Sequence, residues 1–202
     1  MAIDVAAGVL LNPQGEVLLA QRPQGKVYAG WWEVPGGKFE PGETPHEALA
    51  RELEEELGLR IKRSSAWCTR EYHYAHGHVR LHFRRVWHWD GEPRAMESQA
   101  FVWLDPRKPA TTWVAPLLPA TEPLMAWLAL PVCFRGTDAC CDQVAWIEAA
   151  SDEQAQAMVE ARSARSTKPV YHRVGDEYRD VLRLAAQSQL ASSGGTSSPG
   201  SR

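Results

Sequence analysis

The sequence predicts an α+β sandwich followed by a small C-terminal extension. Two observations lead to this prediction. Segments with strand and helix character alternate along residues 3–130, but without the strict strand–helix repeat that builds a doubly wound parallel sheet. One strongly marked amphipathic helix, at residues 44–58, carries leucines on one stripe and charges on another. It can therefore bury one side and offer the other to a ligand.

The chain opens with two apolar segments that we expect to form a β-hairpin. Residues 3–11 (IDVAAGVLL) are typical of a buried strand, residues 12–15 (NPQG) of a turn, and residues 16–22 of a second strand. Arg22 ends this second strand beside a loop rich in aromatic residues. It is either an ordinary surface arginine or a phosphate clamp, because a guanidinium offers a forked, permanently charged set of donors.

The amphipathic helix is marked at both ends. Thr44 can cap its start, Pro45 suits the first helical position, and Glu47 completes a capping box with Thr44. Gly58 suits the C-terminal stop. The apolar stripe consists of three residues spaced four apart: Leu49, Leu53 and Leu57.

The same helix carries three carboxylates at spacing i, i+3 and i+4: Glu52, Glu55 and Glu56. An α-helix turns about 100° per residue, so the three share one arc of roughly 100°. Like charges at this spacing cost an isolated helix about 0.2 to 0.5 kcal/mol per pair, and a bound cation would remove that cost. The alternative is a solvated acidic face. Arg51 can pair with Glu47 one turn back or with Glu43 in the preceding loop.

Residues 65–75 and 78–89 are expected to be a pair of strands around a His76-Gly77 turn. Five histidines fall in this region: His73, His76, His78, His82 and His88. They could bind a metal, but exposed histidines are favoured, because the helix carboxylates already provide a site for a hard cation. Glu97 follows in a loop, before a short strand at residues 101–104 and a short apolar helix at residues 124–130.

The segment around the helix matches a pattern that is hard to meet by chance: Gly37, Glu43, Arg51, Glu52, Leu53, Glu55, Glu56, Gly58 and Leu59. This pattern resembles an intact Nudix box. Residues 3–130 as a whole resemble the MutT branch of the Nudix hydrolases, which remove oxidised deoxynucleoside triphosphates from the nucleotide pool. The branch resemblance rests on residues 32–38 (WEVPGGK), residues 90–93 (DGEP), Glu97 and residues 120–123 (ATEP). It implies an α/β/α sandwich with a mixed sheet over residues 1–132.

The resemblance also implies roles for individual residues. Divalent metals are expected on the carboxylates of Glu52, Glu55, Glu56 and Glu97 and on the carbonyl of Gly36. Arg51 would orient the helix carboxylates through Glu43, and either Glu52 or Glu97 would act as the general base. Five residues are expected to contact the substrate: Arg22, Val34, Gly37, Lys38 and Thr121. Two of them depart from the family pattern, because relatives commonly carry an aromatic residue at Val34 and a base-reading asparagine at Thr121.

The implied reaction is hydrolysis within the phosphate chain of a nucleoside triphosphate. Mg²⁺, or Mn²⁺ in its place, would neutralise phosphate charge and lower the pKa of a bound water. The favoured substrate is 8-oxo-dGTP, cut to the nucleoside monophosphate and pyrophosphate, an activity that prevents replication errors and so supports DNA repair. Two alternatives stay open. One is another Nudix substrate, such as CTP, another dNTP, ADP-ribose or a dinucleotide; the other is a non-catalytic MutT-like module that binds a nucleotide or a lesion.

Composition fits a small-molecule enzyme. The 202 residues carry a formal net charge of -3 and a pI near 6.2, which argues against a protein that coats nucleic acid or an anionic membrane. No stable nucleic-acid binding is therefore expected. No basic residue precedes the apolar N-terminal run and Asp4 interrupts it, so we expect a cytoplasmic protein without a secretory signal or a membrane span. The sequence leaves the oligomeric state open.

Residues 133–190 lie outside the resemblance and are expected to form a small βαβα extension. Its predicted elements are a strand at 143–148, a helix at 152–164, a strand at 169–174 and a helix at 178–189. The segment contains no catalytic constellation, so a structural role is favoured over a second activity. Residues 191–202 (ASSGGTSSPGSR) have the composition of a linker and are expected to be a disordered tail.

Overall fold

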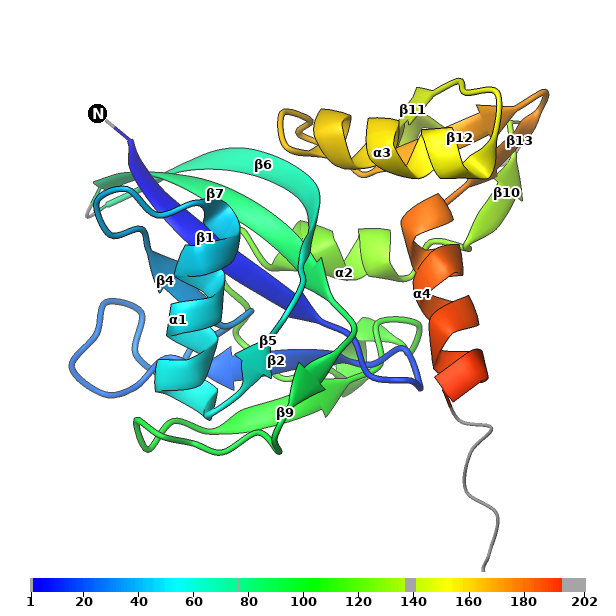
Figure 1. Cartoon of the computed structure of the whole chain (residues 1–202). Helices are drawn as coiled ribbons and strands as arrows, with labels where there is room; N and C mark the ends of the chain where they lie inside the picture. The colour runs from blue at the N-terminus through cyan, green and yellow to red at the C-terminus, as the bar shows by residue number, and fades with distance from the viewer. Residues whose placement is uncertain (1, 76, 137–140, 194–202) are drawn as a thin grey trace, which may run out of the picture.

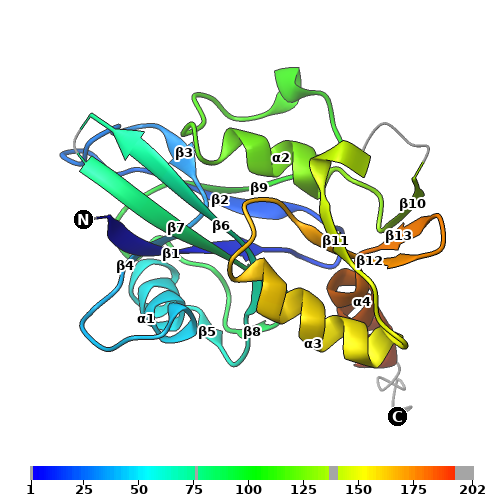
Figure 2. The ribbon, with the colours of Figure 1, turned by 90° about the horizontal axis from the view of Figure 1, so that it is seen from above.

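The computed structural model describes residues 2–75, 77–136 and 141–193. Two helices, α1 (Pro45–Leu57) and α2 (Glu122–Leu128), lie on opposite sides of a layer of strands, as Figure 2 shows. The strands of this layer are β1 (Ile3–Leu10), β2 (Val17–Gln21), β3 (Trp32–Glu33), β4 (Gly36–Lys38), β5 (Arg60–Ile61), β6 (Ser65–Tyr74), β7 (Gly77–Val86), β8 (Trp89–Asp90) and β9 (Phe101–Leu104). The predicted α+β sandwich is therefore confirmed.

The main sheet is mixed, with the strand order β4-β1-β7-β6. Its centre is the parallel pair β1 and β7, which are in register from Ile3 with Val79 to Leu10 with Val86. Both outer strands, β4 and β6, run antiparallel to their neighbours. Strands β3, β2 and β9 form a second sheet in that order, and β5 pairs with β8. The mixed sheet agrees with the prediction, and so does the pairing of residues 65–75 with 78–89.

The predicted N-terminal hairpin is wrong. An isolated antiparallel bridge joins Leu11 to Val17 across the turn, after which β1 and β2 enter different sheets. The physical reason is that β1 pairs on both edges with distant segments, β4 and β7, while β2 pairs with β3 and β9. With both edges of each strand occupied, no edge remains for the local pairing that the short turn suggested.

The alternation of side chains along β1 builds two cores, one on each face of the sheet. Ala6 and Leu10 face α1 and pack with the leucine stripe of that helix. Ala7 and Val9 face the other way and pack with Phe83 and the apolar residues of α2. Because the strand is buried on both faces, it reads as a continuous apolar run rather than an alternating one.

The extension has its own four-stranded sheet, in the order β10-β13-β12-β11 (Figure 1, upper right). Its elements are β10 (Cys133–Arg135), β11 (Ala145–Ile147), α3 (Asp152–Ser163), β12 (Val170–Val174), β13 (Glu177–Arg179) and α4 (Val181–Ser193). The predicted strands at 143–148 and 169–174 and the helix at 152–164 are present. The division between the two parts at residue 132 stays a prediction.

Three details of the predicted extension are wrong. Strands β10 and β13 were not expected, and α4 begins at Val181 instead of residue 178. Gly175 has a φ of 61° and allows a tight turn, so the chain after β12 folds back as β13, where Tyr178 stacks on Phe134 with ring centroids 5.1 Å apart. Helix α4 also continues to Ser193, three residues into the predicted tail. The rest of that tail, residues 194–202, lies outside the described residues, and so do His76 and Cys140.

A buried ion pair joins the extension to the main sheet. The Nη1 and Nη2 atoms of Arg85, on β7, donate to the two carboxylate oxygens of Asp180 at 2.6 and 3.1 Å, and only 4% and 5% of the two side chains is exposed. Asp180 also accepts a hydrogen bond from the backbone N–H of Arg183 in the first turn of α4, at 3.1 Å. One carboxylate therefore caps a helix of the extension and neutralises a buried cation of the N-terminal part.

Among the residues that the structure describes, no helix has the length and apolar character needed to cross a membrane.

Candidate active site

Helix α1 positions the carboxylates, and its predicted boundaries are confirmed. The Thr44 side chain accepts from the backbone N–H of Glu47, while the Glu47 side chain accepts from the backbone N–H of Thr44 at 2.8 Å, which is the expected capping box. Gly58 ends the helix in the left-handed conformation, at φ 66°. Leu49, Leu53 and Leu57 are fully buried, so the helix is fixed along the side opposite to its charges. The Glu47 carboxylate is engaged in this capping box and does not pair with Arg51.

Arg51 therefore pairs with Glu43, the second of the two predicted partners. Its Nε and Nη2 donate to the two carboxylate oxygens of Glu43 at 2.8 and 3.1 Å. The Nη1 atom donates to Glu52 at 2.9 Å and to Glu55 at 3.3 Å, and Nη2 also donates to the carbonyl of Lys38 at 2.9 Å. The hydrogen bonds from Arg51 hold the pKa of Glu43 below its usual range. A single guanidinium thus joins the preceding loop, β4 and the carboxylate face of α1.

Two consecutive glycines let β4 approach this face closely. A Cβ atom on Gly37 would lie 2.2 Å from the carboxylate of Glu52. Gly36 has a φ of 139°, and a Cβ there would lie 2.1 Å from the carbonyl oxygen of Ala6. Its backbone N–H points the other way and donates to Glu56 at 3.2 Å. A larger residue at Gly37 would push against Glu52 of α1, and one at Gly36 would push β4 away from β1.

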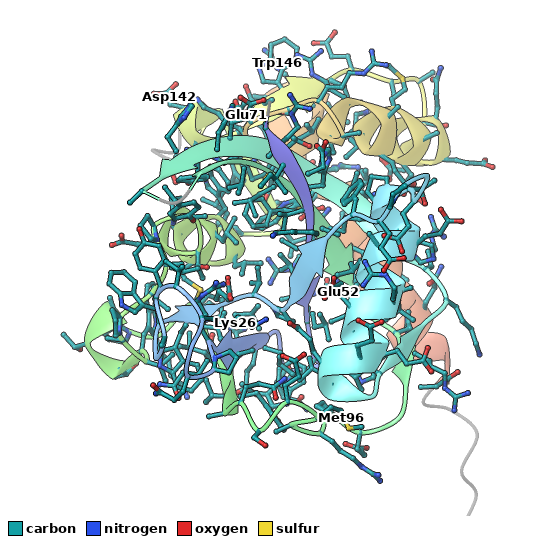
Figure 3. All side chains as sticks on the ribbon, turned by 90° about the vertical axis from the view of Figure 1, so that its left-hand side faces the viewer. Lys26, Glu52, Glu71, Met96, Asp142 and Trp146 are labelled. Carbon is teal, nitrogen blue, oxygen red and sulfur yellow. The ribbon has the colours of Figure 1, made fainter. Side chains whose placement is uncertain are left out.

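The loop that carries Glu97 is tied to the end of α1. The side-chain amide of Gln99 donates to the carbonyl of Glu56 at 2.7 Å, and the backbone N–H of Met96 donates to the same carbonyl at 3.1 Å. The backbone N–H of Glu97 in turn donates to the Gln99 side chain at 2.9 Å. Figure 3 labels Met96 below the C-terminal end of α1 and Glu52 higher on the same helix. Two carboxylates 41 residues apart in the numbering, Glu56 and Glu97, are thereby brought to one site.

The site crowds acidic side chains together in partly buried surroundings, and Arg51 pairs with two of them, Glu52 and Glu55. Burial, together with the charges of Glu52, Glu33 and Glu97, raises the pKa of Glu56 to about 8 despite the hydrogen bond from Gly36. Burial likewise raises the pKa of Glu52, although Arg51 opposes the effect. Carboxylate oxygens are the ligands that Mg²⁺ prefers, and a divalent cation would relieve this mutual repulsion. The donor set therefore fits a hard divalent metal.

The carboxylates share a cleft but do not form a closed cage. Within the described ranges no group of three or more His, Cys, Asp or Glu side chains converges closely enough to hold an ion by itself. Glu55 stands apart, because 59% of its side chain is exposed and it does not line the cleft. An open donor set of this kind suits Mg²⁺, which keeps several waters and shares its coordination with substrate phosphates. Among the histidines, His78 pairs with Glu71 and His82 pairs with Asp4, both on the surface of the strands.

The cleft has a volume of about 490 Å³ and collects most of the residues that the sequence singled out. These are Arg22, Gly36, Gly37, Lys38, Glu52, Glu56 and Glu97. Val34 and Thr121 line a smaller hollow of about 40 Å³ instead, and Thr121 is only 2% exposed. The hollow and the cleft share wall residues, Tyr74 and Leu81 among them. Thr121 is therefore brought next to the cleft without opening into it.

Several cleft residues were not found from the sequence. They are Lys26, Tyr28, Glu33, Tyr74 and Leu81, and Figure 3 labels Lys26 on the loop that faces α1. Glu33 forms an ion pair with Arg22, whose Nε also donates to the carbonyl of Val27 at 2.7 Å. Burial nevertheless raises the pKa of Glu33. Glu33 could have been noticed because it lies within the WEVPGGK segment. The other four residues belong to no motif that the sequence analysis used.

A model of the NUDIX domain matches residues 1–128. The chain belongs to the Nudix hydrolase family. As a Nudix hydrolase it acts on phosphoric anhydride bonds. The extension lies beyond the matched residues.

Individual relatives agree with this assignment. A Haemophilus influenzae protein named 8-oxo-dGTP diphosphatase is 39% identical over 103 residues, which make up 51% of this chain and 76% of that protein. An Escherichia coli CTP pyrophosphohydrolase is 38% identical over 129 residues, 63% of this chain and 93% of the relative. A crystal structure of a MutT Nudix hydrolase from Burkholderia pseudomallei matches with a TM-score of 0.56 and 26% identity, over 62% of this chain and 97% of that one. The resemblance to the MutT-like Nudix proteins is thus confirmed.

Proposed function

We propose that this Nudix hydrolase is a Mg²⁺-dependent nucleoside triphosphate pyrophosphohydrolase whose main substrate is 8-oxo-dGTP. The observation that carries the proposal is the composition of the cleft of about 490 Å³. Partly buried carboxylates, Glu52 and Glu56, lie at one wall, and the cations Arg22 and Lys38 line the same space. A metal-bound triphosphate needs both kinds of group close together, because carboxylates bind the metal and cations bind the phosphate oxygens. The similarity to proteins named 8-oxo-dGTP diphosphatase supports the choice of substrate.

Each residue has a proposed task. The metal would be held by Glu52, Glu56, Glu97 and the Gly36 carbonyl, and Glu55 would be a further ligand at the exposed rim. When bound, Mg²⁺ supplies neutralisation of phosphate charge and increases the acidity of a nearby water. Arg51 and Glu43 fix the orientation of the helix carboxylates. Lys38 and Arg22 bind phosphate oxygens, and the Gly37 backbone leaves room for them.

We assign the general base to Glu52 in preference to Glu97. Burial raises the pKa of Glu52, which is the direction that brings a carboxylate closer to the working pH of a base. Its hydrogen bond to Arg51, at 2.9 Å, also fixes its orientation. Glu97 is exposed and lies in a loop, a position in which it would serve as a metal ligand.

A second candidate substrate is CTP. The Escherichia coli CTP pyrophosphohydrolase matches a longer segment of this chain than the Haemophilus influenzae protein does, 129 residues against 103. In addition, the hydroxyl of Thr121 offers fewer hydrogen-bonding atoms for reading a purine edge than an asparagine would.

The deciding experiment is a panel of nucleotides assayed for pyrophosphate release with Mg²⁺ and ranked by kcat/KM. The panel contains 8-oxo-dGTP, dGTP, CTP, dCTP, ADP-ribose and a dinucleoside polyphosphate. The proposal expects 8-oxo-dGTP to rank first and dGTP to follow it. If a pyrimidine triphosphate ranks first, the assignment of 8-oxo-dGTP as the main substrate is wrong. If no triphosphate releases pyrophosphate, the proposed reaction itself is wrong.

A further inference from the structure

A second and larger hollow lies where the extension meets the Nudix domain. Its volume is about 570 Å³, and it shares no lining residue with the active-site cleft. One wall comes from residues 60–65 and 85–90 of the Nudix domain, and the other from α3 and α4 of the extension, which lie near β8 in Figure 2. A hollow of this size can enclose a small ligand, since most ligand pockets measure roughly 300 to 1,000 Å³.

Positive charge dominates the lining of this junction cleft. Four cations line it, Arg60, Lys62, Arg63 and Arg85, against one carboxylate, Asp90, among the described residues. Arg85 is neutralised by its bidentate pair with Asp180, which lies outside the lining. The remaining three cations stand at the rim, where all three residues are exposed. The rim therefore keeps an excess of positive charge.

The rim cations are free to exchange partners. Lys62 pairs with Asp90 at 3.2 Å, but 85% and 60% of the two side chains is exposed. Arg63 approaches Glu160 only to 3.7 Å, and Arg60 has no ion-pair partner among the described residues. Exposed pairs of this kind are worth about 0 to 1 kcal/mol, so an incoming phosphate can replace them at little cost.

The inner part of the junction cleft is aromatic and apolar. Trp87 and Trp89 line it and are partly exposed, and Leu182 of α4 lines it from the other side. The Arg85 guanidinium lies 5.0 Å from the centre of the Trp87 ring. Its buried Nε lacks a hydrogen-bond acceptor within the described part of the chain, which is uncommon for a buried donor. Flat rings beside a buried cation suit a planar heterocycle.

We propose that the junction cleft binds a small nucleoside phosphate at a site separate from the catalytic one. The phosphate would be held by Arg60, Lys62 and Arg63 at the rim, and the base would lie against Trp87 and Trp89. A nucleoside mono- or diphosphate matches the volume, whereas a duplex does not. Because the two walls belong to different parts of the chain, the ligand also clamps the extension to the Nudix domain.

The test uses the full chain with the metal chelated by EDTA, which weakens phosphate binding in the catalytic cleft. Adenosine 5′-monophosphate is titrated by calorimetry against the wild type and against Arg60→Glu/Arg63→Glu. The matched control is Arg165→Glu, an exposed arginine of the extension that lines neither cleft. We expect saturable binding that the double variant weakens at least tenfold and that the control changes less than twofold. Equal binding by all three proteins, or no binding at all, would overturn the proposal.

Two further arms locate the ligand and define its chemistry. Hydrogen–deuterium exchange of the wild type with the nucleotide should show protection in residues 60–65 and 182–189; protection confined to residues 36–56 would place the ligand in the catalytic cleft and contradict the proposal. Adenosine and inorganic phosphate should each bind at least tenfold more weakly than the nucleotide. If inorganic phosphate binds as tightly, the site takes a simple anion and the base-binding role of the tryptophans is wrong. None of these outcomes depends on which triphosphate the enzyme hydrolyses.

Discussion

Within the described part of the molecule, the junction and the catalytic face of α1 both bring charged side chains into buried surroundings, and the two are built in opposite ways. At the junction, Arg85 and Asp180 meet in a bidentate pair that leaves both neutralised. At the catalytic face of α1, carboxylates gather beside one another, and burial, reinforced by the neighbouring charges, raises the pKa of Glu56 to about 8. The paired charges compensate each other's burial, whereas the clustered carboxylates repel one another. A fold retains the second arrangement only where a ligand of opposite charge is needed.

This contrast separates residues that hold the fold from residues that serve the reaction. Removing one partner at the junction should destabilise the protein and leave the chemistry in place. Removing a carboxylate from α1 should do the reverse. The following predictions test the contrast in order of decreasing effect.

The largest effect is expected for Glu56→Gln. It removes a proposed metal ligand, so kcat/KM should fall about a thousandfold, which corresponds to about 4 kcal/mol of transition-state stabilisation. Steady-state kinetics with saturating Mg²⁺ would measure it. The matched control is Glu54→Gln, an exposed glutamate on the same helix that does not line the cleft. Activity within tenfold of the wild type would mean that the metal site lies elsewhere.

The next effect concerns the junction. Arg85→Met or Asp180→Asn each leaves one buried charge unpaired and should lower the free energy of unfolding by about 3 to 5 kcal/mol. The double variant Arg85→Met/Asp180→Asn should lose much less than the sum of the two. Chemical denaturation of all four proteins gives this cycle, and the kcat/KM of the folded variants should stay within a few-fold of the wild type. Additive losses would show that the pair contributes no coupling.

A smaller effect is expected in the pH dependence of stability. The folded pKa of Glu56 is about 8 and its ordinary value is 4.5, so the folded chain binds more protons than the unfolded chain between these values. Its contribution to stability is complete below pH 4.5 and is lost as the pH rises through 8. We expect the metal-free wild type to lose about 1 to 3 kcal/mol across this window relative to Glu56→Gln. Parallel profiles for the two proteins would contradict the assigned burial.

The smallest effect concerns a buried neutral group, Thr121, which has no side-chain cap bond at the start of α2. An asparagine there would offer both a donor and an acceptor to a purine, so Thr121→Asn should widen the preference for 8-oxo-dGTP over dGTP by about tenfold. The ratio of the two kcat/KM values is the measurement. An unchanged ratio in a folded variant would show that this side chain does not reach the base from its hollow.

The features that could be predicted from the sequence are the local ones, and the features that could not be predicted join distant segments of the chain. The cap at Thr44, the stop at Gly58 and the carboxylate face of α1 depend on residues within a few turns of one another, so local rules found them. The pairing of β1 with β7 joins residues 76 apart, the pair between Arg85 and Asp180 joins residues 95 apart, and no periodicity records such a pairing. Glu33 was missed for a related reason: its importance comes from being buried beside Glu56 and Arg22 in the folded chain.

The central claim is that the carboxylates on α1 destabilise the folded chain until a divalent cation binds. Thermal unfolding of the wild type and Glu56→Gln, first in EDTA and then with increasing Mg²⁺, tests it most directly. In EDTA at neutral pH the variant should have the higher Tm, because a glutamine side chain avoids the cost that raises the pKa of the buried Glu56. With Mg²⁺ the wild type should gain stability until it exceeds the variant, whose own gain should be small. Equal Tm values in EDTA and equal responses to Mg²⁺ would contradict the claim.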